Sequence, residues 1–128
     1  MKLLLDTHLL LSAAGHAERL SNAAIELIER PDNDLWFSVA SLWELVIKRG
    51  LGRKDFRVDP RLLRRGLLEN GYSELPIASE HAIAVEALPM IHRDPFDRML
   101  IAQAMHEGLT LLTSDRSVAQ YPGSIRMV

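Results

Sequence analysis

Cysteine is absent from this chain of 128 residues. Its absence excludes disulfides, zinc sites with thiolate ligands, iron–sulfur clusters and thiol nucleophiles. Long hydrophobic runs are absent too, and Asp6 and His8 interrupt the apolar amino terminus, which a secretory signal would keep apolar. With a hydrophobic fraction of 48% and a charged fraction of 25%, the sequence predicts one cytoplasmic domain, residues 1–128, with no membrane contact.

Several catalytic signatures are also missing. No G-x-x-x-x-G-K-[ST] loop is present, so hydrolysis of nucleoside triphosphates has no support. No nucleophile elbow surrounds a serine, so the serines, histidines and aspartates form no recognisable triad. Internal repeats and low-complexity tracts are absent as well. The charged side chains are the remaining candidates for chemistry.

Basic residues are concentrated in one segment, although the net charge is only −2. Residues 48–65 hold eight of the fifteen basic residues and only two acidic ones, so this segment is net +6 and the remainder is net −8. Such an asymmetry is compatible with a cation site beside a surface that binds a polyanion. It is equally compatible with two solvated helix faces.

Short apolar runs alternate with helical patterns along the chain. The predicted strands are residues 2–5, 35–39, 72–77, 110–113 and 125–128, the third at a sheet edge because Pro76 lacks an N–H group. The predicted helices start at Ser21, Ser41, Asp59-Pro60, Ser79 and Asp94-Pro95, and end near Glu29, Gly50, Glu69, Leu88 and Gly108. This alternation predicts the α/β class, a three-layer α/β/α sandwich with a central, mainly parallel sheet.

Four acidic residues fall where such a fold places its sites. Asp6 follows the first strand and Asp115 follows the strand 110–113, so both are expected at the carboxyl edge of the sheet. Glu44 and Asp97 are expected in the first turns of helices that begin near the same edge. Each acid also has a structural explanation, because helix capping, a Ser41–Glu44 capping box, the helix dipole or a turn accounts for it singly.

Four carboxylates at one edge would repel one another unless a cation or protonation intervened. Oxygen ligands in a chain without cysteine suit a hard cation such as Mg²⁺ or Mn²⁺. Phosphodiester hydrolysis assisted by one or two such ions is the chemistry that follows.

Three stretches, "LLLDTHLLL", "SVASLWELVIK" and "HRDPFDRMLIAQAMHEGLTLLTSD", together resemble the PIN-domain family and, within it, the VapC-type toxins of toxin–antitoxin pairs. The resemblance spans nearly the whole chain, and it implies a PIN-like fold and an Mg²⁺- or Mn²⁺-dependent endoribonuclease. It also implies an RNA substrate, a cognate antitoxin and a homodimer. It assigns catalysis and metal binding to Asp6, Glu44, Asp97 and Asp115, with support from Thr7 and from Thr113 or Ser114. Many relatives have asparagine where this chain has His8.

Other residues receive more limited assignments. Asp94 is expected mainly as a helix cap, with a supporting role beside the metal. Trp43 is expected in the core, although an exposed indole there could stack a base. The basic segment, with charges near the acids, is the candidate for RNA backbone binding. The residues proposed for this contact are Lys48, Arg49, Arg53, Lys54, Arg98 and Arg116.

Two interpretations without catalysis compete with the nuclease. A receiver-like module would hold Mg²⁺ with acids at strand ends. It would also require a lysine late in the sequence, and this chain has no lysine after Lys54. A catalytically silent PIN-like interaction module would keep the same acids without cleaving RNA.

Overall fold

The computed structural model describes all residues, 1–128, and contains one parallel sheet. The sheet has the strand order β3-β2-β1-β4-β5, and every neighbouring pair is parallel. The strands are β1 (Lys2–Leu5), β2 (Asp34–Ser38), β3 (Ser73–Leu75), β4 (Thr110–Thr113) and β5 (Ile125–Met127). The α/β class, the parallel sheet and the edge position of the third strand are therefore confirmed.

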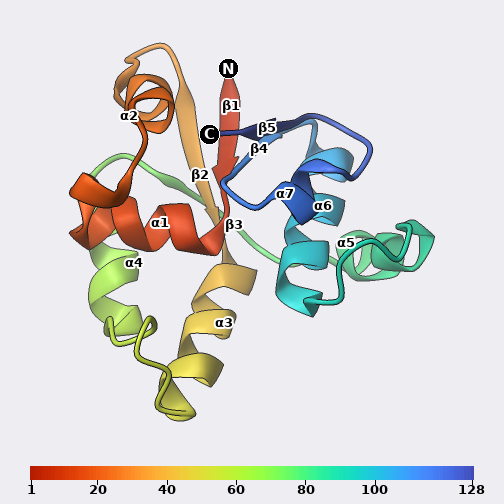
Figure 1. Ribbon diagram of the computed structural model, residues 1–128, viewed down its shortest axis with the longest axis horizontal. Coiled ribbons are helices and arrows are strands. Elements are labelled where there is room, and N and C mark those ends of the chain that lie inside the picture. Colours follow the sequence, from red (N-terminus) through yellow and green to blue (C-terminus); the bar gives the residue numbers. More distant parts are fainter.

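Helices connect the strands and cover the sheet (Figure 1). The α-helices are α1 (Thr7–Gly15), α2 (Asn22–Glu29), α3 (Val39–Gly50), α4 (Pro60–Glu69), α5 (Ser79–Ala84), α6 (Pro95–Glu107) and α7 (Arg116–Ala119). Two short 3-10 helices are η1 (Ala17–Arg19) and η2 (Val85–Ala87). None of these helices combines the length and the hydrophobicity that a membrane span requires.

The core lies on both faces of the sheet, because alternate side chains of a strand point to opposite faces. Leu3 and Leu5 pack into one apolar cluster with residues of α1 and α4, whereas Leu4 packs into a second cluster with residues of α6. Figure 1 shows α1, α2 and α4 on one side of the strands and α5, α6 and α7 on the other. The predicted three-layer sandwich is confirmed.

Several helix boundaries follow the predicted caps. Asp59 and Asp94 each accept a backbone N–H at the start of α4 and α6, with proline at the first helical position. Gly108 ends α6 at a φ of 69°, a left-handed conformation that glycine adopts without a Cβ clash. These signals depend only on neighbouring residues, which explains why the sequence located them correctly.

Five local predictions were wrong. Helix α3 begins at Val39 because the Ser38 side chain caps it by accepting the Ala40 N–H, so neither the strand to residue 39 nor a cap at Ser41 is present. Helix α5 begins at Ser79, which lies inside the first turn and is not the cap, and it ends at Ala84. Trp43 is 57% exposed and therefore lies outside the core.

Strand β1 lies at the centre of the sheet and marks the point where the strand order reverses. The chain runs from β1 outward through β2 to β3, and β4 then returns to the other side of β1. In parallel α/β sheets, the crevice at such a point, beyond the carboxyl ends of the strands, is where ligands bind. Asp6 is the first residue beyond β1 at this point.

Candidate functional site

Asp6 is held in a fixed orientation at the end of β1. Its carboxylate is 5% exposed; Oδ1 accepts the Leu9 N–H at 2.9 Å and Oδ2 accepts the Thr113 hydroxyl at 2.6 Å. Burial raises the pKa of Asp6, against these two hydrogen bonds, which lower it. Asp6 does cap α1, as its structural explanation required, but it also lies near enough to Glu44 for the charge of that carboxylate to raise the pKa of Asp6.

Glu44 approaches Asp6 from α3 and is 2% exposed. The Thr7 hydroxyl donates to Glu44 Oε1 at 2.6 Å, and Ser41 Oγ lies 2.9 Å from the same hydroxyl. Because α3 begins at Val39, Glu44 lies in the second turn and does not return to the helix start. The predicted capping box between Ser41 and Glu44 is therefore absent. Glu44 is instead held by the hydrogen bond from Thr7.

Lys48 forms an ion pair inside this group of acids. Its Nζ lies 2.5 Å from Glu44 Oε2 and 3.5 Å from Asp94 Oδ2. Desolvation is the largest single effect on the pKa of Lys48 and lowers it, but Glu44 and Asp94 together raise the pKa above its ordinary value. The lysine is therefore a stable cation of the site. The spacing of four residues between Glu44 and Lys48 on one helix favours this ion pair. The prediction that Lys48 binds RNA did not take that pair into account.

Asp97 lies one turn into α6, behind the cap Asp94. Asp94 Oδ1 accepts the N–H groups of Phe96 and Asp97, while Asp97 Oδ2 lies 2.8 Å from His92 Nε2. Burial raises the pKa of Asp97 to about 6, helped by the charges of Asp94, Glu44 and Asp6 and opposed by the His92 hydrogen bond. That mutual effect places Asp97 in the same electrostatic neighbourhood as Asp6 and Glu44.

Asp115 joins the group through Thr113. The Thr113 Oγ1 that donates to Asp6 also accepts the Asp115 N–H at 3.0 Å, and Asp115 Oδ1 caps α7 by accepting the Ser117 N–H at 2.8 Å. Thr113 is fully buried, whereas Ser114 is exposed and its side chain makes no hydrogen bond. Of the two residues predicted as alternatives, Thr113 makes the supporting contacts.

Two carboxylate oxygens carry neither a hydrogen bond nor an ion pair, namely Asp97 Oδ1 and Asp115 Oδ2. Asp6 adds the remaining lone pairs of its two oxygens. Such an oxygen-only set is the donor chemistry that Mg²⁺ and Mn²⁺ prefer. The donor chemistry of these acids therefore suits a hard divalent cation. Among them, only Asp94 and Asp97, together with His92, belong to a group of three whose ligand atoms all lie within 4.8 Å of one another, and Asp6, Glu44 and Asp115 are in no such group.

The predicted RNA-contacting residues divide into exposed and buried ones. Arg49, Arg53, Lys54 and Arg116 are exposed. Arg98 is only 7% exposed, and its guanidinium donates to the carbonyl oxygens of Pro89, Val85 and Leu88 and to the Tyr121 hydroxyl. Arg98 is therefore a structural residue, and its assignment to RNA is wrong because its donors are already engaged.

The loop between α3 and α4 places basic side chains beside the acids. Phe56 is fully buried, and three basic groups surround its ring. Lys48 Nζ lies 4.9 Å from the ring centroid, Arg53 Cζ lies 5.7 Å from it, and the His8 ring meets it edge-on at 5.6 Å. Phe56 thus anchors part of the basic segment next to the site, a role that sequence reasoning missed.

A second cluster with metal-ligand atoms, His81, His106 and Glu107, lies between α5 and α6. His81 is 2% exposed, and its Nδ1 accepts the Ala78 N–H at 3.0 Å. The proton of a neutral His81 is therefore on Nε2, which lies 3.0 Å from Glu107 Oε2 and donates to it. That proton occupies the position a metal would need, so the cluster is a hydrogen-bonded contact between helices.

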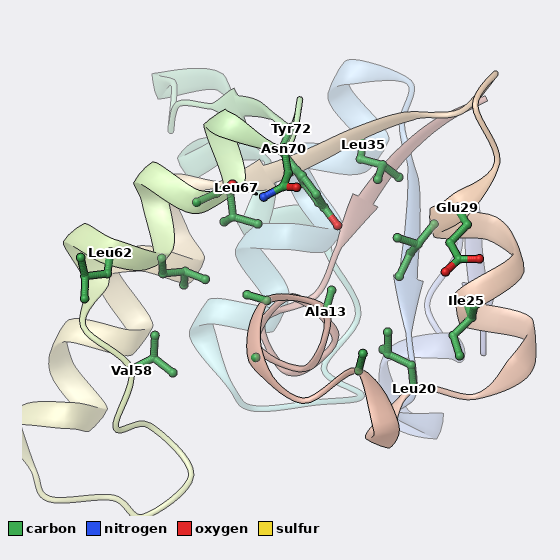
Figure 2. A pocket seen from close by; sticks show the side chains of 16 residues that line it. Ala13, Leu20, Ile25, Glu29, Leu35, Val58, Leu62, Leu67, Asn70 and Tyr72 are labelled. Carbon is green, nitrogen blue, oxygen red and sulfur yellow. Dashed lines mark hydrogen bonds between the residues drawn. The ribbon is translucent and has the colours of Figure 1, made fainter.

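An apolar groove of about 550 Å³ lies at the C-terminal end of α1, which supplies Ala13, Ala14 and Gly15, whereas Asp6 and Thr7 lie at the start of that helix. Helices α1, α2 and α4 supply its walls, and twelve of its sixteen lining residues are hydrophobic. Figure 2 shows Leu20 and Ile25 on one wall and Val58, Leu62 and Leu67 on the other. Leu62 is 57% exposed at the rim.

The fold and site define a parallel α/β domain with carboxylates gathered where the strand order reverses. The model of the PIN domain family matches residues 3–123, so the chain belongs to the PIN domain family. A comparison with curated proteins found no match.

Solved structures share the fold over all or nearly all of the chain. The chain is similar to VapBC2 from Rickettsia felis bound to a DNA fragment from their promoter, with a TM-score of 0.72, 14% identity and coverage of 100% and 99% of the two chains. It is similar to VapBC-1 from nontypeable Haemophilus influenzae, with a TM-score of 0.62, 18% identity and coverage of 94% and 91%. DNA-bound VapBC from Salmonella typhimurium gives a TM-score of 0.60, 18% identity and coverage of 100% and 97%.

Proposed function

We propose that this protein is a metal-dependent endoribonuclease and the toxin of a toxin–antitoxin pair. The observation that carries the proposal is the convergence of Asp6, Glu44 and Asp97, from three separate elements, at the switch point of a PIN domain. Buried carboxylates that raise the pKa of one another favour a bound cation. Membership of the PIN family and the shared fold with VapBC structures support the same proposal.

Asp6, Asp97 and Asp115 would hold the ion. Thr113, which hydrogen-bonds to both Asp6 and Asp115, would fix the spacing of those two acids. Bound Mg²⁺ or Mn²⁺ would acidify a water molecule and stabilise the charge that develops on the phosphate during hydrolysis. Thr7 orients Glu44, and Asp94 fixes the start of α6 and so the position of Asp97. These contacts preorganise the carboxylates before substrate arrives.

We place the RNA backbone on the exposed basic residues near the site, Arg49, Arg53, Lys54 and Arg116. Their charges attract phosphates regardless of base sequence. Arg53 lies against Phe56, which also contacts Lys48 of the acidic site, so the two surfaces are adjacent. A strand held along the loop would therefore pass near the carboxylates.

The decisive experiment measures RNA cleavage by purified protein with Mg²⁺, with Mn²⁺ and with chelator, and maps the cut sites. Asp6→Asn removes a ligand charge but retains a side chain that caps α1 well, so the fold should persist. The matched control is Asp55→Asn, an exposed carboxylate that contacts only His8 and Arg53. We expect cleavage only with metal, lost in Asp6→Asn and kept in the control. Equal cleavage by all three proteins, or cleavage in chelator, would contradict the proposal.

We infer that the apolar groove between α1, α2 and α4 receives a segment of the cognate antitoxin. VapBC structures are pairs whose fold this chain shares, and the groove leaves leucine side chains open to solvent. Leu62→Asp should weaken binding of the antitoxin encoded beside the gene at least tenfold. Leu68→Asp is the control, because this leucine is 41% exposed on the same helix but outside the groove. Equal binding of both variants would place the partner elsewhere.

We propose that the chain forms a homodimer through a second exposed apolar face, which α3 and α5 present. Trp43 and Val46 on α3, and Ile83 on α5, are 57%, 53% and 70% exposed, and α3, α5 and α6 enclose a small apolar hollow between them. We propose that a second copy of the chain covers this face. Light scattering should show a dimer that Ile83→Lys converts to a monomer. Leu51→Lys, at a 75% exposed leucine elsewhere, should leave the dimer intact.

A further inference from the structure

We propose that Lys48 takes the place of a second divalent cation, so that the acidic site holds one metal ion beside a built-in ammonium group. The inference rests on the proposed nuclease function and specifies how its site is composed. It decides between one and two ions, a choice that the sequence left open.

Lys48 is bound on several sides. Its Nζ lies 2.5 Å from Glu44 Oε2 and 3.5 Å from Asp94 Oδ2, and its side chain is 15% exposed. The rings of Phe56 and Phe96 lie 4.9 and 5.7 Å from the same nitrogen. A surface lysine samples many rotamers, whereas this one is confined by two carboxylates and two aromatic faces. The ammonium group therefore belongs to the site.

The carboxylate oxygens on this side are already used. Glu44 Oε1 accepts from Thr7 and Oε2 pairs with Lys48. Asp94 Oδ1 accepts two backbone N–H groups, and Oδ2 faces Lys48. A second divalent ion would need Glu44 as a ligand, with Asp94 beside it, and it would then have to displace the Lys48 ammonium group from its ion pair. Among the five acids of the site, only Asp97 Oδ1 and Asp115 Oδ2 carry neither a hydrogen bond nor an ion pair.

The ammonium group also supplies what a second cation would contribute electrostatically. In sites with two ions, the second cation stabilises charge on the oxygens of the phosphate during displacement. A lysine ammonium is a compact point charge with three donors and can bind a phosphate oxygen. Glu44 and Asp94 hold that charge at the edge of the acidic cluster, so Lys48 can contribute without a metal being recruited.

Mn²⁺ binding measured by calorimetry and equilibrium dialysis tests the inference without reference to activity. Wild type should bind one Mn²⁺ per chain. Lys48→Met and Lys48→Gln, which remove the charge, should bind two, because Glu44 and Asp94 are then free. Arg57→Met is the control, because Arg57 is exposed, forms no ion pair with an acid and has no role in the site, and this variant should bind one ion.

The double variant Glu44→Gln/Lys48→Met should return to one ion, because the second site loses its carboxylate. Lys48→Gln retains a hydrogen-bond donor toward Glu44, and it keeps the test available if Lys48→Met fails to fold by circular dichroism. Two ions in wild type, or one ion in both Lys48 variants, would overturn the inference. One ion in wild type without RNA cleavage under any metal would overturn the nuclease but not the stoichiometry. No binding at all would overturn both.

Discussion

The Thr113 hydroxyl donates to Asp6 Oδ2 at 2.6 Å, across the boundary between the two central strands. β1 and β4 pair with Leu5 opposite Leu112, so the residues that follow this pair, Asp6 just beyond β1 and Thr113 at the end of β4, lie at the same edge of the sheet. The same hydroxyl oxygen accepts the Asp115 N–H. One fully buried threonine thus sets the spacing of two acids from distant parts of the chain.

Thr113→Val should weaken Mn²⁺ binding by about 10- to 100-fold, the usual effect of losing a partner that orients a metal ligand. Valine keeps the volume and the strand preference, so the fold should survive. Ser114→Ala is the control, because that serine is exposed and its side chain is free of hydrogen bonds. Calorimetric titration distinguishes the two, and equal affinities in both variants would show that Thr113 does not orient Asp6.

Arg98→Met should lower the free energy of unfolding by about 3 kcal/mol, since it leaves several buried carbonyl groups unpaired. The arginine also contacts Tyr121, whose hydroxyl accepts the His92 N–H, so the loop before α6 should loosen. Arg93→Met changes an exposed neighbour and should stay within about 0.5 kcal/mol of wild type. Urea unfolding measures both. An Arg98 variant as stable as the control would contradict the structural role.

The free energy of unfolding of the metal-free protein should fall as the pH rises through about 6, because folding raises the pKa of Asp97 from 3.8 to about 6. A raised pKa means that the folded state binds the proton more tightly than the unfolded state does. The resulting stabilisation is complete below about pH 4 and is lost above the folded pKa. Asp97→Asn, which cannot ionise, should therefore gain stability relative to wild type between pH 4 and pH 7. A difference that stays constant over this interval, measured by urea unfolding, would refute the assignment.

Charge reversal at Arg53 and Lys54 should weaken RNA binding and reduce its dependence on salt. Each lost phosphate contact on a single strand lowers the slope of log K against log salt by about 0.7. Metal affinity should be unchanged, since neither residue contacts the acids that would bind the ion. Arg30→Glu, an exposed charge outside the basic segment, serves as the control. If the slope of log K against log salt equals that of wild type, RNA does not bind at this surface.

The sequence was sufficient for the features that depend on local signals. The proline-containing caps at Asp59 and Asp94 and the left-handed Gly108 located helix ends within a residue. The parallel sheet followed from the alternation of elements, and the position of Asp6 followed from the end of β1. These features need no knowledge of contacts between distant residues.

The missed features depend on tertiary packing. Ser38 and Ser41 both resemble helix caps, and only the end of β2 decides in favour of Ser38. Arg98 carries the same charge as Arg93, but its place on α6 directs its guanidinium toward the buried carbonyl groups of the preceding loop. The partner of Lys48 was visible as an i,i+4 spacing, whereas its second acid, Asp94, comes from another helix. Charge alone could not separate these roles.

We propose that Asp97 and its neighbours hold the cation on which RNA cleavage depends. The most direct measurement compares the Mn²⁺ dependence of the cleavage rate with the Mn²⁺ dissociation constant from calorimetry, in wild type and in Asp97→Asn. We predict that both curves of wild type share one midpoint, and that Asp97→Asn loses binding and cleavage together, each by at least tenfold. Cleavage that persists in Asp97→Asn at the wild-type rate, or that is independent of Mn²⁺, would show that Asp97 does not hold a catalytic cation.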